Sequence, residues 1–516
     1  MTTTTDSTAD STSSASQSKV EHVDVAIIGA GLSGIGMACH LRRAHPDRTI
    51  AVIERRERMG GTWDLFRYPG VRSDTDMVSF GYTFAPWTSE KVMGDGAEIR
   101  RYVEQMAKDY DIASRLRYGL KVTDLDWSSE DRQWTVRSTH EASGEQRSLT
   151  ADFVVACSGY YDYDQGYRPD FPDEDKFGGQ FIHPQFWPED LDYTGKNVVV
   201  IGSGATAVTI VPAMVDKAGH VTMLQRSPSY IFALPNTDAI ANALGKVLPQ
   251  KLNFRLTRAR NVAVQRTLFK ACQRWPGPMR KFLLGRVEKA VGPDVDMKHF
   301  SPDYDPWDER LCASPDGDLF TALREGRASI VTDEITSFTE DGVVVSSGEH
   351  IPADIVITAT GLQLKMLGGA AMSVDGEPVE VPEKMTYKAT LLEDVPNFAL
   401  AFGYTNAPWT LKSDLVGRYL VRLLSYMDEA GLDAAIPRDR KGKDTGRSIM
   451  DGFQPGYVQR GEHLLPRQGS EHPWNVTMNY EVDKEILDEG PIDDGLVEFL
   501  PARDREPLEA PAAARA

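Results

Sequence analysis

Short apolar runs recur along the chain and predict buried strands of parallel sheets. Residues 23–28 (VDVAII) lead into a glycine-rich turn and a helical stretch, and residues 49–54 (TIAVIE) then form a second apolar run. The same order returns at residues 197–201 (NVVVI) and 220–225 (HVTMLQ). Strand, tight turn, helix and parallel strand make one β-α-β unit. The pattern therefore predicts two such units.

Two further runs resemble each other and predict the strand that closes each unit. Residues 151–159 (ADFVVACSG) and 353–361 (ADIVITATG) both combine an acid, an apolar run and a terminal glycine. Because the second unit lies between them, we expect it to interrupt the first. The expected division is a first domain from 20–165 and 365–500, a second from 166–230 and 301–364, a helical insertion at 231–300, a disordered tail at 1–19 and a flexible tail at 501–516.

The insertion differs in charge from the rest of the chain. Residues 251–290 contain eleven Lys or Arg and one acid, so they carry +10 while the remainder carries −29. Helical spacing predicts an apolar stripe and a separate basic stripe, formed respectively by Val264, Leu268, Cys272 and Trp275, and by Arg266, Lys270 and Arg274. One interpretation is an insertion that packs one face on the core. The alternative is weak peripheral contact with an anionic membrane, where each nearby Lys or Arg adds ~1 kcal/mol.

Composition narrows the class of protein. A chain of 516 residues favours two or three domains. Its net charge of −19 argues against nucleic-acid binding, because a phosphate backbone would be repelled. The four cysteines are far apart, which predicts no metal site and suits a reducing compartment. Residues 1–19 have neither a basic nor an apolar signal region, so we expect a cytoplasmic protein.

The first glycine turn carries a dinucleotide fingerprint. Gly29, Gly31 and Gly34 follow a strand and open a helix, an arrangement that lets a diphosphate approach the helix N-terminus. Glu54 ends the next strand twenty residues after Gly34. A carboxylate there accepts hydrogen bonds from ribose hydroxyls and repels a 2′-phosphate. This unit therefore suits FAD or NAD rather than NADP.

The second glycine turn differs at the same position. Residues 202–207 (GSGATA) follow the strand, and the next strand runs into Arg226 and Ser227 instead of an acid. A guanidinium beside a hydroxyl suits a 2′-phosphate. The first unit therefore fits FAD and the second fits NADPH. The sequence predicts an α/β fold with two doubly wound, Rossmann-like dinucleotide-binding domains and a helical insertion.

Two longer motifs lie among these loops. Residues 177–188 fit F-x-G-x-x-x-H-x-x-x-W-P through Phe177, Gly179, His183, Trp187 and Pro188. Residues 60–74 read GGTWDLFRYPGVRSD. Together they resemble the signatures of type I Baeyer–Villiger flavin monooxygenases, and residues 20 to about 500 are most similar to the ethionamide-activating FAD-containing subgroup. The related N- and S-monooxygenases usually end the first motif in Tyr or Phe.

The resemblance implies particular contacts. FAD would be held by the first glycine loop with Ser33 and Glu54, by the backbone of Val122, and by Thr62, Trp63, Asp64, Leu65 and Asp74. NADPH would be held by Arg72, Ser73, Gly202, Ser203, Gly204, Ala205, Thr206, Ala207, Val208, Arg226 and Ser227. The implied reaction inserts oxygen from O2 into a ketone through a C4a-peroxyflavin, giving an ester or lactone, and extends to sulfides and thioamides.

By the same resemblance, Arg310 in PWDERLC would be the catalytic arginine, held in place by Asp74. Many relatives have Lys before this arginine, where the chain has Glu309, so NADPH preference depends more on Arg226 and Ser227. The alternative for Arg310 is an ion pair with Asp305 or Asp308. His183 and Trp187 have no direct part in the chemistry. Their place before the second glycine loop suggests that they couple nucleotide binding to domain rotation.

Three other functions share some of these features. A disulfide reductase also pairs FAD with NADPH, but residues 55–75 contain no cysteine. An N- or S-oxygenating flavin monooxygenase is opposed by the Trp187-Pro188 ending. A flavin-binding redox sensor without turnover would not need a complete NADP site.

Overall fold

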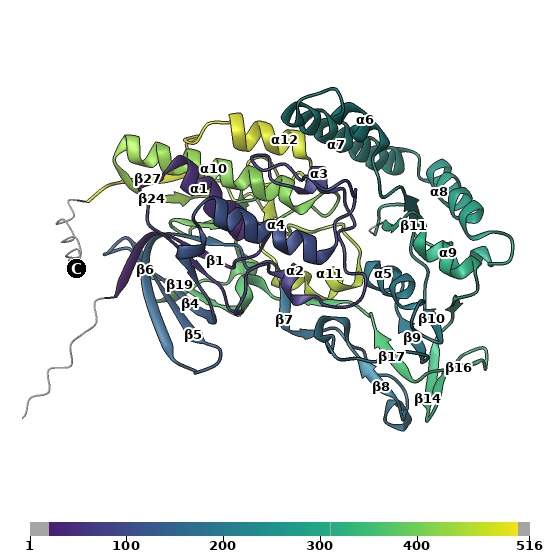
Figure 1. The fold of residues 1–516 in the computed structure, drawn as a ribbon. Coiled ribbons are helices and arrows are strands. Elements are labelled where there is room, and N and C mark those ends of the chain that lie inside the picture. Colours follow the sequence, from purple (N-terminus) through teal and green to yellow (C-terminus); the bar gives the residue numbers. More distant parts are fainter. Residues whose placement is uncertain (1–19, 310, 504–516) are drawn as a thin grey trace, which may run out of the picture.

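The computed structural model describes residues 20–309 and 311–503. Two sheets form separate cores, with the larger sheet in one lobe and the smaller in the other (Figure 1). Both cores contain parallel strands next to helices, as the α/β prediction requires. The predicted fold class is therefore confirmed.

The larger sheet is centred on β1 (Glu21–Ile28), which pairs in parallel with β2 (Ile50–Ile53) and β6 (Gln146–Ala156). The two similar runs at residues 151–159 and 353–361 occupy equivalent positions in the two sheets. β6 lies next to β1 in one sheet, and β17 (Ile355–Thr358) lies next to β9 (Asn197–Ile201) in the other. The remaining strands of the larger sheet are β3 (Leu116–Arg117), β4 (Leu120–Ser128), β5 (Gln133–His140), β19 (Ala371–Val374), β20 (Glu377–Pro378), β21 (Thr386–Tyr387), β22 (Leu391–Leu392) and β23 (Phe398–Leu400).

The smaller sheet has the order β13-β10-β9-β17-β8, with every pair parallel. Its other strands are β8 (Gln180–Ile182), β10 (His220–Gln225) and β13 (Ala328–Thr332). Small ladders lie beside the sheets: β11 (Ile231–Leu234) with β12 (Cys312–Pro315), β14 (Ile335–Thr339) with β15 (Gly342–Val345) and β16 (His350–Pro352), β24 (Leu432–Pro437) with β27 (Val497–Pro501), and β25 (Asp444–Ser448) with β26 (Arg467–Gly469).

Two segments connect the lobes. β7 (Tyr161–Gly166) leaves the larger sheet after β6, and β18 (Leu362–Leu364) returns from the smaller sheet after β17. They pair antiparallel with each other. The chain then completes the larger sheet with β19 to β23, so the first unit is interrupted by the second.

Helices cover both cores. On the larger sheet these include α1 (Leu32–Ala44), α4 (Gly96–Asp109) and the long α10 (Trp409–Ala430), and on the smaller sheet α5 (Ala205–Met214) and α9 (Asp318–Arg324). Shorter helices are α2 (Thr62–Leu65), α3 (Met77–Phe80), α11 (Gly456–Gly461) and α12 (Tyr480–Lys484). Across residues 20–309 and 311–503, no helix has both the length and the apolar content needed to cross a membrane.

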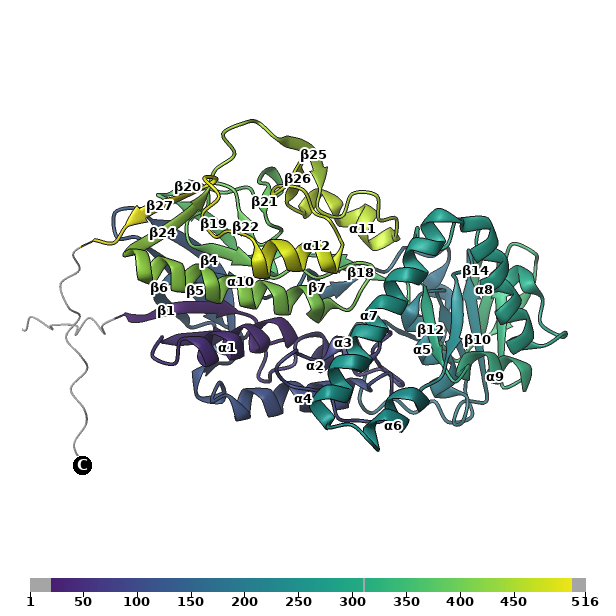
Figure 2. The same ribbon diagram turned by 90° about the horizontal axis from the view of Figure 1, so that it is seen from above.

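The insertion consists of α6 (Ala239–Gly245), α7 (Gln250–Arg274) and α8 (Pro276–Val291). Figure 2 shows α7 lying beside α3. The buried Arg258 donates from Nη1 to the carbonyl oxygens of Val78 and Gly81, at 2.8 and 2.7 Å. Val287 and Val291 of α8 instead pack in the core of the smaller sheet. The insertion therefore touches both lobes.

The predicted apolar stripe of the insertion is wrong at two of its four positions. Cys272 is buried, but Val264 is 61% exposed and Trp275 is 58% exposed. Trp275 also lies beyond the end of α7, where the chain turns into α8. The helix packs through Phe254 and Arg258 instead, so part of its apolar surface faces solvent.

Candidate dinucleotide-binding site

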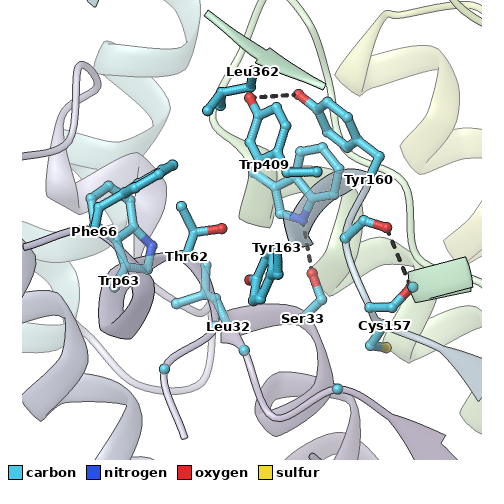
Figure 3. Close-up of a pocket in the computed structure, with 18 of the residues that line it drawn as sticks. Leu32, Ser33, Thr62, Trp63, Phe66, Cys157, Tyr160, Tyr163, Leu362 and Trp409 are labelled. Atoms are coloured by element: carbon cyan, nitrogen blue, oxygen red, sulfur yellow. Dashed lines mark hydrogen bonds between the residues drawn. The ribbon is translucent and has the colours of Figure 1, made fainter. Parts of the chain in front are cut away.

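One cavity of about 370 Å³ lies where the two lobes meet. Its walls come from the first glycine loop, α2 and the segment after it, the start of β4, the end of β6, the start of α5, and the start of α10. Figure 3 shows side chains from these separate segments facing the same space, among them Leu32, Trp63, Tyr160, Leu362 and Trp409. The cavity lies at the carboxyl ends of parallel strands, where ligands bind in doubly wound folds.

The first glycine loop packs directly on the end of β6. Gly29 has a φ of +99°, and a Cβ at this position would lie 2.6 Å from the carbonyl oxygen of Cys157. A side chain is therefore excluded both by backbone conformation and by space. Helix α1 begins three residues later with its free N–H groups at the cavity, as the fingerprint predicted.

Glu54 is buried beside this loop. Its Oε2 accepts a hydrogen bond from the N–H of Ala30 at 2.7 Å, and its Oε1 accepts one from the N–H of Arg56 at 2.9 Å. Burial, the largest influence, raises the pKa of Glu54, while these two N–H groups act to lower it. Each oxygen has a second lone pair for a hydroxyl donor. Glu54 also lines the cavity.

The second glycine loop repeats this geometry on the smaller sheet. Gly202 has a φ of +143°, and a Cβ there would lie 2.3 Å from the carbonyl oxygen of Ala359, at the end of β17. Ala205 and Thr206, at the start of α5, line the cavity. Arg226 and Ser227 follow β10 and are exposed, as a contact with an incoming phosphate requires.

The segment from α2 to α3 belongs to the larger lobe but docks on the smaller one. A Cβ on Gly70 would lie 2.7 Å from Cβ of Ala213 on α5. The side chain of Tyr68 is hydrogen-bonded to Thr206 and packs on the core of the smaller sheet. This segment therefore contributes to the cavity wall at the place where the lobes meet.

Most of the predicted flavin contacts meet at the cavity, but not all of them. Those that line it are Gly29, Gly31, Ser33, Glu54, Thr62, Trp63, Asp74 and Val122. Gly34, Asp64 and Leu65 do not. Asp64 is 1% exposed and pairs with Arg56 at 2.8 Å and Arg67 at 2.7 Å, so its carboxylate is already neutralised.

The predicted NADP contacts are spread more widely. Arg72, Ser73, Ala205 and Thr206 line the cavity, whereas Gly202, Ser203, Gly204, Ala207, Val208, Arg226 and Ser227 lie outside its wall. Ser203 is nevertheless linked to the following loop, since Ser229 donates to its hydroxyl at 3.0 Å. Arg310, the predicted catalytic residue, lies outside the described residues.

Sequence reasoning missed an aromatic wall. Trp409 donates from Nε1 to the hydroxyl of Ser33 at 2.8 Å, and its ring stacks with that of Tyr160 at 5.2 Å (Figure 3). Tyr163 also lines the cavity. Tyr160 lies in the turn after the closing strand β6, and Tyr163 lies in β7. Ligands of doubly wound folds bind near such strand ends. Pro408 before a long amphipathic helix was the available signal for Trp409.

His183 lies at the crossing of the two connecting segments. Its Nε2 donates to the carbonyl oxygen of Gly361 at 3.2 Å, and its Nδ1 accepts from the N–H of Gln185 at 3.2 Å. A Cβ on Gly166 of β7 would lie 1.9 Å from Cε1 of His183. Trp187 packs on the core of the smaller sheet. Neither residue lines the cavity.

Comparison with known proteins agrees with this geometry. Residues 22–240 match a family model described as flavin-binding monooxygenase-like. The chain is 56% identical to the protein MymA of Mycobacterium tuberculosis strain H37Rv over 93% of its own length and 98% of that protein. It is 48% identical to the FAD-containing monooxygenase EthA of the same strain, again over 93% and 98%.

Two solved structures share the fold. An oxidized steroid monooxygenase bound to NADP has a TM-score of 0.74 at 21% identity, and the match covers 93% of this chain and 100% of that one. An open structure of cyclohexanone monooxygenase has a TM-score of 0.72 at 20% identity, covering 93% and 99%. The predicted cofactors, FAD and NADP, agree with the names of these relatives. The resemblance inferred from the motifs is confirmed, and the chain belongs to the flavin-binding monooxygenase-like family, in the group that includes EthA and MymA.

Proposed function

We propose that this protein is an FAD- and NADPH-dependent Baeyer–Villiger monooxygenase that converts ketones to esters or lactones with O2 and also oxygenates sulfides or thioamides. The observation that carries the proposal is that two glycine loops of matching geometry, one followed by Glu54 and one by Arg226, both lead to one cavity. The first loop lines this cavity directly, and the second reaches it through Ala205 and Thr206 at the start of α5. Each loop then binds one of the two nucleotides. Electrons can pass between the nucleotides only where both reach the same cavity.

The residues present fit FAD. The loop at Gly29 leaves room for a diphosphate, Glu54 can accept from the ribose, and the aromatic wall suits a planar ring. Bound FAD would supply hydride acceptance and O2 activation, which side chains cannot provide. The chain would bind and orient both nucleotides and exclude water from the cavity.

The charge that develops on a ketone oxygen during the reaction needs a fixed cation. We assign this role to Arg310 on the family motif, with Asp74 in the cavity wall to hold it. Loss of such a stabilising group typically lowers the rate about a hundredfold or more. Of these two residues, the structure describes only Asp74.

The reaction class is tested by products. Purified, FAD-loaded protein is incubated with NADPH, O2 and a panel of ketones, sulfides and amines, and the products are identified by mass spectrometry. We expect esters or lactones from ketones and sulfoxides from sulfides. Sulfoxides or N-oxides without any ester would assign the protein to the N- and S-monooxygenases. NADPH oxidation that no substrate stimulates would favour a redox sensor.

Nucleotide preference is predicted to depend on Arg226. Replacing Arg226 by Ala removes a charged donor suited to the 2′-phosphate, which is worth about 1.5–3 kcal/mol. The KM for NADPH should rise roughly tenfold or more, while the KM for NADH, which lacks this phosphate, stays nearly constant. The control is Arg327→Ala, which removes an exposed arginine that pairs with Asp216 elsewhere in the smaller lobe. Equal changes with both nucleotides would contradict the assignment.

His183 is proposed to couple nucleotide binding to the movement of the lobes. Burial, the largest influence, lowers the pKa of His183, so its ring is neutral at neutral pH and serves as a hydrogen-bonding wedge between β7 and β18. We predict that His183→Ala retains FAD but slows flavin reduction by NADPH about tenfold, measured by anaerobic stopped flow, since a lost buried hydrogen bond costs about 1–3 kcal/mol. Gln180→Ala, on the exposed side of β8, is the control. An unchanged reduction rate would remove His183 from the functional residues.

The insertion presents a surface suited to a membrane. Among the described residues, seven large apolar side chains of residues 239–291 are exposed: Ile240, Val247, Leu252, Leu256, Val264, Trp275 and Phe282. Helix α7 contains no acid and seven Lys or Arg, of which Arg258 is buried and Arg266 pairs with Glu481. Exposed apolar groups interspersed with basic ones are typical of helices that lie on anionic bilayers. We propose that this face makes peripheral contact with such a bilayer.

Sedimentation with vesicles tests the proposed membrane contact. We expect binding to vesicles rich in anionic lipid, little binding to zwitterionic vesicles, and release by salt. The double variant Trp275→Ser and Phe282→Ser should bind less, whereas Phe186→Ser, which removes a 49% exposed ring outside the insertion, should bind as the parent does. Equal sedimentation with both vesicle types would contradict an electrostatic contact.

A further inference from the structure

Arg72 is a buried cation in the wall between the lobes, and two of the three nitrogens of its guanidinium lack a hydrogen-bond partner. Its side chain is 9% exposed, and its Nη1 lies 3.1 Å from Oδ2 of Asp318. Its Nε and Nη2 are shielded from solvent and have no hydrogen-bond partner. These two atoms lie on one edge of the planar group, the edge that binds a phosphate or carboxylate through two parallel hydrogen bonds. Buried charged donors are rarely left in this state unless a ligand completes them.

Asp318 belongs to the opposite lobe from Arg72. It is the first residue of α9, whose Leu319 and Phe320 lie in the core of the smaller sheet. Arg72 belongs to the segment that follows α2 in the larger lobe. The pair therefore crosses the junction at which the cavity is formed, beside the docking contact of Gly70 with α5.

Asp318 is itself held in one orientation. Its Oδ1 accepts from the hydroxyl of Ser314 at 2.7 Å and from the N–H of Leu319 at 2.8 Å. Ser314 is completely buried, 0% exposed. These bonds leave Oδ2 for Arg72, so the carboxylate fixes one end of the guanidinium and does not compete for its Nε and Nη2 edge.

We propose that Asp318 is a positioning residue for the nicotinamide nucleotide, because it holds Arg72 so that the free edge of the guanidinium meets the nucleotide's diphosphate. This proposal rests on the proposed use of NADPH. It assigns Asp318 a role opposite to the one its charge suggests, since a carboxylate near an anion site would otherwise weaken binding by repulsion.

The opposite signs of these two effects provide the test. NADP⁺, which does not react, is titrated into the FAD-loaded protein, and its Kd is measured by calorimetry. Positioning predicts that Asp318→Asn raises the Kd about tenfold, whereas simple repulsion predicts that it lowers the Kd. Ser314→Ala should raise the Kd in the same direction by a smaller factor, and it replaces the first variant if that one does not fold.

A double-mutant cycle separates positioning from general stability. In an Arg72→Ala background, Asp318→Asn should produce no further weakening, because the group that it positions is gone. Asp216→Asn, which breaks an exposed ion pair with Arg327 on the same lobe, should leave the Kd of NADP⁺ unchanged. Melting temperatures measured alongside show whether any variant acts through the fold.

The outcomes distinguish the two proposals. If the parent protein does not bind NADP⁺, the proposed function fails. If the parent binds but Asp318→Asn binds equally well or more tightly, the positioning role is wrong. Additive weakening in the cycle, with a lowered melting temperature, would likewise overturn it.

Discussion

The close approach of each glycine loop to the end of its closing strand is the constraint on which the rest of the site depends. Gly29 lies against the carbonyl of Cys157 and Gly202 against that of Ala359, at distances that no side chain could occupy. Because each loop lies so close to the end of its closing strand, the first turns of α1 and α5 both line the cavity at the strand ends. The diphosphate of a nucleotide can then approach a helix N-terminus in each lobe.

A second constraint follows from the first, because two such sites can cooperate only if the lobes are held in a fixed relative orientation. The segment after α2 holds them through three contacts: Gly70 packs on α5, Tyr68 bonds to Thr206, and Arg72 pairs with Asp318. The connecting strands β7 and β18 also meet next to His183. The long motifs of the sequence therefore correspond largely to contacts between lobes.

The strands, the glycine loops and the two-unit topology could be predicted from the sequence because their signals are local. Glu54, for example, directly follows β2, where the local pattern TIAVIE puts it. The aromatic wall could not be predicted, because Trp409 reaches Ser33 across 376 positions of the chain. Local spacing also failed at Trp275, where helical periodicity predicted burial but the packing of α7 is determined by Arg258 and its partners on another segment.

Asp64 illustrates a different limit. The motif assigned it a flavin contact, yet the structure surrounds its carboxylate with arginines behind the cavity wall. A motif shows only which residues occur together along the chain. Whether a side chain faces a ligand depends on the neighbouring side chains that bind it instead. Arg72 is the opposite case, because Asp318 pairs only with its Nη1 and leaves the Nε and Nη2 edge without a protein partner.

The proposed function requires that two nucleotides bound in separate lobes react in one shared cavity. Anaerobic mixing of the FAD-loaded protein with NADPH, with flavin absorbance as the readout, shows whether they do. We expect rapid loss of the yellow colour with one equivalent of NADPH and a much slower loss with NADH. A protein that binds NADPH and stays yellow would contradict the proposed function.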